Sequence, residues 1–215
     1  MLAKVISGAV VGIDGRLVTI EVDITKKGFG AFRIVGLASK SADEARDRIH
    51  TAIENSEIEF TKYKVTVNLA PADLPKEGPF YDVPIAVGIL LAMGKIVTEN
   101  VTSKMMFVGE LSLDGGVKST PAILPLTMLA KETSCTEIFV PEQNAKEASI
   151  VDGITIYPVK SLKQLILHLN QTVLITPIES NNYSINPDEI LPDYVLEDVK
   201  GQPIAKRALI IAAAG

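Results

Sequence analysis

The chain has 215 residues, of which 47% are hydrophobic and 22% charged, and this balance is typical of a globular protein with one core. Aromatic residues make up only 5% and Trp is absent, which argues against a broad stacking platform for single-stranded nucleic acid. The one cysteine, Cys135, cannot form an internal disulfide and indicates a reducing, cytoplasmic setting. The longest apolar stretch, residues 83–93, is too short to cross a bilayer, so we expect no membrane contact.

The formal net charge of −5 is concentrated in one segment. Residues 179–198 hold six acidic side chains and no Lys or Arg, so the rest of the chain is close to neutral. The negative total therefore does not exclude contact with nucleic acid on another face.

The first third of the chain is rich in strand patterns. Alternating apolar residues predict strands at 3–13 and 17–24, joined by an Asp14–Gly15 turn, and a third strand at 31–35. Ser41–Glu44 has the form of a capping box and predicts the start of a helix. Its apolar residues repeat at helical spacing, and we expect its charged residues to face solvent: Arg46, Asp47, Arg48 and Glu54.

Next come a predicted strand at 63–69, a Pro-rich loop, and a buried helix that Asp82 caps and Gly94 ends. Strands and helices then alternate, which requires a sheet and helices packed in layers. The expected strands are 105–113, 137–140 and 154–157, and the expected helices are 123–132, 142–151, 162–169 and 204–214.

Two groups of motifs resemble the YifB/ComM family of magnesium-chelatase-like AAA+ ATPases. The first is NLAPADLPKEG at 68–78 with FVGELSLDG at 107–115, and the second is DVKGQ at 198–202 with AKRAL at 205–209. The resemblance covers essentially the whole chain. It implies an α/β, Lon-protease-like domain of the ribosomal S5 domain 2-like fold at 1–170. It further implies an acidic, Pro-containing linker at 171–197 and the first residues of a truncated AAA+ module at 198–215.

The second motif has a consequence for nucleotide chemistry. The resemblance implies that Val199, Gly201 and Gln202 line the adenine side of a nucleotide pocket in the full-length protein. A phosphate loop of the GxxxxGK[ST] type is absent from the sequence, so we expect this chain to hydrolyse no ATP and to hold no cofactor. The resemblance implies ATP and Mg²⁺ as ligands of the full-length protein.

The Lon-like frame lacks its catalytic residues. Lon-type proteases carry a nucleophilic Ser in a PKDGPSAG stretch, and PKEGPFYD at 75–82 places Phe80 in that slot. Counting without gaps from Gly109 places the Lys slot at Leu124. Phe and Leu supply neither a hydroxyl nor an amine, so we expect no peptidase activity. His50 and His168 each stand alone, and we expect no metal site.

The resemblance implies a non-catalytic module of a homo-hexameric motor that acts in DNA processing, namely competence and branch migration. The expected partners are its own AAA+ module, neighbouring subunits, and single-stranded or branched DNA. Two alternatives are a protein–protein assembly domain without DNA contact and a subunit related to porphyrin metal chelation. A contiguous basic surface would favour DNA, whereas an apolar one would favour subunit packing. The candidate DNA-binding residues, which are otherwise scattered solubilising charges, are Lys26, Lys27, Arg33, Lys62, Lys64 and Lys76.

Overall fold

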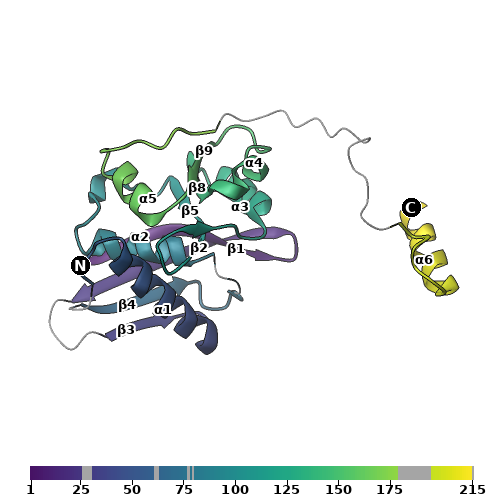
Figure 1. Ribbon diagram of the computed structural model, residues 1–215, viewed down its shortest axis with the longest axis horizontal. Coiled ribbons are helices and arrows are strands. Elements are labelled where there is room, and N and C mark those ends of the chain that lie inside the picture. The colour runs from purple at the N-terminus through teal and green to yellow at the C-terminus, as the bar shows by residue number, and fades with distance from the viewer. Residues whose placement is uncertain (26–30, 61–62, 77, 79, 179–194, 215) are drawn as a thin grey trace. The chain divides into compact units, whose positions relative to one another are not determined.

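The computed structural model describes residues 1–25, 31–60, 63–76, 78, 80–178 and 195–214. The chain forms two separate units, Met1–Asn181 and Asn182–Gly215. The described part of the first unit is a mixed α/β domain around a seven-stranded sheet of order β3-β4-β2-β1-β5-β8-β9, shown in Figure 1. The predicted layered α/β class is confirmed. The domain boundaries at 170 and 197 stay a prediction.

Strands and helices alternate along the first unit, and none of the described helices is long and apolar enough to span a bilayer. The strands are β1 (Leu2–Val11), β2 (Asp14–Thr25), β3 (Ala31–Val35), β4 (Lys64–Ala70), β5 (Met105–Phe107), β6 (Glu110–Leu111), β7 (Val117–Lys118), β8 (Glu137–Pro141) and β9 (Thr155–Val159). The helices are α1 (Ser39–Asn55), α2 (Asp82–Ala92), η1 (Thr98–Asn100), α3 (Ile123–Glu132), η2 (Glu142–Asn144), α4 (Ala145–Ala148), α5 (Leu162–Leu169) and, in the second unit, α6 (Pro203–Ala214).

The long hairpin of β1 and β2 turns two residues earlier than the sequence predicts. Val11 pairs with Asp14, so the turn is Gly12–Ile13, where Gly12 has a φ of +66°. The predicted Asp14–Gly15 turn is wrong because Gly15 serves helix packing instead. A Cβ at Gly15 would lie 2.6 Å from the Cβ of Leu129 on α3, so a glycine is needed for α3 to pack this closely.

The unit β3–α1–β4 is a parallel βαβ crossover. Its helix buries the predicted apolar face, including Ile49 and Ile53. The helix begins at Ser39, with Ala38 as N-cap and no side-chain cap, so the capping box expected at Ser41–Glu44 is wrong. Those residues lie inside the first turns of the helix.

The helix α2 is the centre of the core, and all its residues are buried. It packs so closely on the hairpin that a Cβ at Gly88 would lie 2.6 Å from the Val22 side chain. The helix ends at Ala92 with Met93 as C-cap, and Gly94 follows with a φ of +72°, close to the predicted end. Asp82, however, does not cap it: the N-cap is Tyr81, and no side chain accepts a capping hydrogen bond.

The second half of the sheet consists of three parallel strands, β5, β8 and β9, which extend β1. The strand predicted at 105–113 is two strands, because Gly109 with a φ of +155° breaks it and β6 turns away to pair with β7. The helix predicted at 142–151 is a 3₁₀ turn, η2, followed by the short α4.

Helices cover the two sheet faces unequally. Val5 faces α2 on one side, while Gly8 faces α3 on the other, next to Leu126 and Leu129. On the α3 side, α3 contacts the hairpin and β8, α4 contacts β8 and β9, and Met106, Ile138 and Ile156 are buried. Toward the other end of β1, β2, β4 and β3, polar side chains occupy alternate positions. We call this the open sheet face, and its polar residues include Lys4, Glu21, Asp23, Arg33, Lys64, Thr66 and Asn68. The exposed apolar residues Leu2 and Val35 share it.

Candidate functional site

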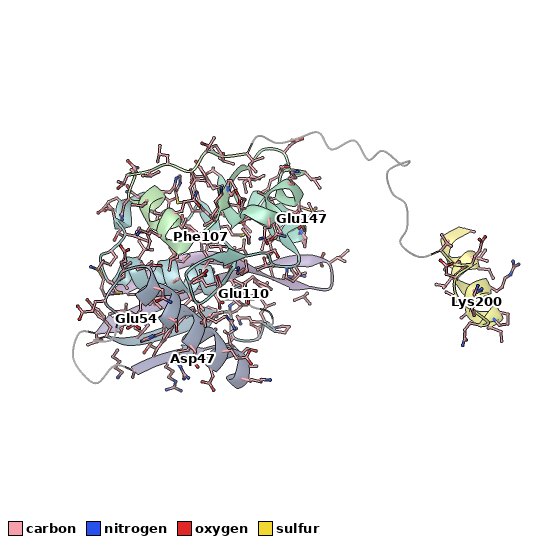
Figure 2. All side chains as sticks on the ribbon, viewed as in Figure 1. Asp47, Glu54, Phe107, Glu110, Glu147 and Lys200 are labelled. Atoms are coloured by element: carbon pink, nitrogen blue, oxygen red, sulfur yellow. The ribbon has the colours of Figure 1, made fainter. Side chains whose placement is uncertain are left out.

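A cleft of about 290 Å³ lies between α1, the start of α2 and β6, where the resemblance places the nucleophile of a Lon-type protease. Ser41, Glu44 and Arg48 line it from α1, and Asp82 and Glu110 close it from the other side. Figure 2 labels Glu110, which lines this cleft, near the middle of the first unit. Four of the nine residues that line the cleft are therefore charged.

Phe80 fills the expected Ser slot with a buried ring. It is 5% exposed, and its ring centroid lies 4.6 Å from that of Tyr81. A Cβ at Gly78 would lie 2.6 Å from the Phe80 ring, so the loop accommodates this ring only because residue 78 is a glycine. Leu124, in the Lys slot, is half-buried on α3 and lines a separate groove with Met128.

A bidentate ion pair occupies the floor of the cleft. Arg48 Nε and Nη2 donate to the two carboxylate oxygens of Asp82 at 2.7 and 3.1 Å, and the N–H of Leu111 donates to Oδ2 at 3.2 Å. Burial raises the pKa of Asp82 to about 6, although Arg48 and the Leu111 N–H oppose the shift. Arg48 was expected to face solvent, and that expectation is wrong. The pair links α1, α2 and β6.

Lys76 is also withdrawn from the surface. It is 4% exposed, and its amine donates to the carbonyl of Pro71 and, at 3.0 Å, to that of Leu74. Burial lowers the pKa of this amine. The hydroxyl of Tyr81 is buried without a hydrogen-bond partner within the described part of the chain, so the Lys76 amine and this hydroxyl form no pair. Lys76 stabilises its own loop and is not available to a surface ligand.

The open sheet face carries two cations without acidic partners among the residues that the structure describes. Arg33 and Lys64 are exposed and lie on adjacent strands, since Arg33 pairs with Thr66 and Lys64 with Ala31. Neither forms an ion pair with any acidic residue that the structure describes.

The acidic residues of the same face are already neutralised. Glu21 accepts Lys4 Nζ at 2.9 Å and Asn68 Nδ2 at 3.1 Å, and its bond with Lys4 is the main reason that its pKa is lowered. Asp23 lies 3.5 Å from the N-terminal amine of Met1. The uncompensated charge of the open sheet face is therefore positive.

Three of the sequence candidates, Lys26, Lys27 and Lys62, lie outside the described residues. Sequence reasoning missed a further exposed cation, Lys104, which precedes β5 and whose carbonyl accepts the N–H groups of residues 136 and 137. Lys104 shares a sheet edge with Lys64 only because of the order of the strands. Nothing in the sequence around Lys104 predicts this position.

In the second unit, Val199 is exposed, and Gly201 and Gln202 have φ values of +70° and +53°. The carbonyl of Gln202 accepts the N–H of Lys206 at 3.0 Å at the start of α6. The role of Val199, Gly201 and Gln202 beside a bound nucleotide stays a prediction. The described residues contain no group of three or more His, Cys, Asp or Glu side chains arranged to hold a metal ion.

Residues 20–144 match the family model described as subunit ChlI of Mg-chelatase. Over its whole length the chain is 39% identical to the competence protein ComM of Haemophilus influenzae and 36% identical to YifB of Escherichia coli. It spans 42% and 41% of those two proteins. Over 80% of its length it is 27% identical to Lon protease 2 of Bacillus subtilis, of which it covers 33%. The chain thus belongs to the family of the ChlI subunit of magnesium chelatase.

Proposed function

We propose that the first unit is a non-catalytic domain of an AAA+ ATPase that binds single-stranded or branched DNA through the open sheet face. The observation that carries this proposal is the pairing of charges there: Glu21 and Asp23 are neutralised, while Arg33 and Lys64 are not. Phosphate contacts by such cations supply most of the affinity of sequence-independent binding. The likeness to a protein named for competence supports DNA as the ligand.

The test is a fluorescence anisotropy titration with labelled single-stranded DNA at salt concentrations of about 50 and about 200 mM. Replacing Arg33 and Lys64 together by Gln is expected to weaken binding. Because each lost phosphate contact lowers the salt slope of a single strand by about 0.7, the slope should fall by about 1.4.

The matched control replaces Lys160 and Lys163 by Gln. These two lysines pair with Glu142 and Glu57 away from the open sheet face, and the change in net charge is the same. Equal losses of affinity in the two double variants would refute a specific role for the open sheet face.

A second function, subunit assembly, is favoured by a different surface. A groove of about 690 Å³ runs beside α3 and α4 and is lined by Leu124, Met128 and Ile150. Met128 is 49% exposed and Ile150 is 42% exposed, which suits contact with another protein. Met128→Lys should shift sedimentation velocity profiles toward smaller species, and unchanged profiles would contradict an assembly role for the groove.

For the full-length protein we propose ATP and Mg²⁺ as ligands, with Val199, Gly201 and Gln202 beside the adenine, and a homo-hexameric ring as the working form. The ChlI family match and the resemblance of residues 198–215 to the entry of an AAA+ module support this. ATP turnover by the full-length protein, measured with and without DNA, tests it.

A further inference from the structure

A second pocket lies at the amino ends of β5, β8 and β9, beneath the carboxyl end of α5. Its volume is about 420 Å³, which is enough for one nucleobase with its sugar. Five side chains with polar groups line it, together with apolar side chains such as Met105. These five are Asn100, Glu137, Tyr157, His168 and Gln171.

Two of these polar groups have no hydrogen-bond or ion-pair partner among the described residues, and a third, His168, is bonded through Nδ1. Neither the Glu137 carboxylate nor the Tyr157 hydroxyl has a hydrogen bond or ion pair within the described residues, and both residues are half-buried. His168 Nδ1 accepts the N–H of Ile175 at 3.0 Å, so Nε2 carries the proton of the neutral ring and is a donor. Burial lowers the pKa of His168, which keeps the ring neutral.

The chemistry of the pocket selects a ligand with both donors and an acceptor. The half-buried Glu137 carboxylate has no cation beside it among the described residues, so it needs N–H donors. Burial raises the pKa of this carboxyl. The Nε2–H of His168 and the Tyr157 hydroxyl offer donors to a carbonyl oxygen. Guanine presents two adjacent N–H groups and a carbonyl on one edge, whereas adenine presents a lone pair where the carboxylate needs a donor.

The pocket also lies on the sheet edge that carries the proposed DNA contacts. Because Ile6 is in register with Met106 and Thr25 with Lys64, the amino ends of β5 and β4 share that edge. Four strand spacings, or about 19 Å, separate β8 from β4 in the plane of the sheet. Glu137 is in register with Met105, on the α2 face, so a single strand must pass round this edge to reach the pocket from the open sheet face. Lys104 is exposed on this edge between them.

We infer that this pocket binds an unstacked guanine base, with Glu137 reading its N–H donors and His168 and Tyr157 its carbonyl. The inference rests on the proposed function for the source of the base, a single strand held by the open sheet face. The same recognition would also hold for a free guanine nucleotide, so the experiment separates the two sources.

The test has two arms, each measured by calorimetric titration on the wild-type chain and on Glu137→Gln. In the first arm the probes are dGMP and dAMP, and dGMP should bind on the order of tenfold more tightly. In the second arm the probes are thymidine oligonucleotides with and without one central guanine, and the guanine should strengthen binding. Glu137→Gln should abolish both preferences.

The matched control is Glu142→Gln, an exposed carboxylate next in the chain to β8, which should keep both preferences. Equal binding of dGMP and dAMP by the wild type, or selective binding of arginine amide in their place, overturns the inference. Oligonucleotide binding without a guanine preference overturns the inference and leaves the proposed function standing. A preference for dGMP without any oligonucleotide binding supports the guanine pocket and overturns the proposed DNA-binding function.

Discussion

Removal of the Arg48 guanidinium is expected to destabilise the domain strongly. Arg48→Met keeps most of the apolar stem but leaves the Asp82 carboxylate, whose side chain is 1% exposed, with only the Leu111 N–H. Removing one partner of a buried pair costs about 3–5 kcal/mol. Because the Arg48 side chain is 23% exposed and water can reach the gap, we expect about 3 kcal/mol, at the lower end of that range.

The loss should depend on pH in a definite direction. The folded-state pKa of Asp82 is about 6, above its model value of 3.8, and it rises further without Arg48. Below about pH 6 the carboxyl is mostly protonated in the folded wild type, so the guanidinium contributes little there. The destabilisation by Arg48→Met should therefore grow as the pH rises through 6 toward 8.

Urea unfolding followed by far-UV circular dichroism measures this, since the chain has no Trp. The midpoint should fall by about 1 M or more at neutral pH. Arg46→Met is the matched control, because Arg46 pairs with Asp43 and Asp47 on the surface, where such contacts contribute about 0–1 kcal/mol. A loss below about 1 kcal/mol for Arg48→Met, equal at pH 5 and pH 8, would refute the reasoning.

Two further predictions concern single buried groups. Lys76→Met should lower the free energy of unfolding by about 1–2 kcal/mol, because two loop carbonyls lose their donor. The control Lys64→Met removes an exposed amine and should change it little. Equal unfolding midpoints for the two variants would count against a structural role for the Lys76 amine. Cys135 is 5% exposed and burial raises the pKa of its thiol, so a thiol reagent should label the native chain far more slowly than the urea-unfolded chain, and equal rates would contradict its burial.

The sequence predicted those elements whose signals are local. The continuous apolar run of α2, ended by Gly94, and the third strand at residues 31–35 both have such signals, and both were found where expected. The hairpin turn was misplaced because Asp14–Gly15 satisfies the local rule for a turn. The contact that Gly15 makes with Leu129 is separated from it by more than a hundred residues and leaves no local trace.

The candidate site was only partly predictable for the same reason. The absence of a nucleophile at Phe80 follows from the motif alone, and the structure shows a buried ring there. The pairing of Arg48 with Asp82 spans 34 residues and shows no periodicity in the sequence. The guanine-pocket inference likewise depends on strand order, since Glu137 and His168 come from β8 and α5, elements that no sequence pattern places side by side.

The central place of β1 in the sheet affects how the chain is made. Ile6 is in register with Met106, a partner that leaves the ribosome 100 residues later, so the β1 edge of the nascent hairpin stays unpaired while α1, β4 and α2 are still being synthesised. During that interval neighbouring nascent chains expose the same β1 edge, and two such edges can pair with each other. Translation that pauses before residue 105 should therefore yield more aggregate than a pause after residue 141, when β5 and β8 have closed that side.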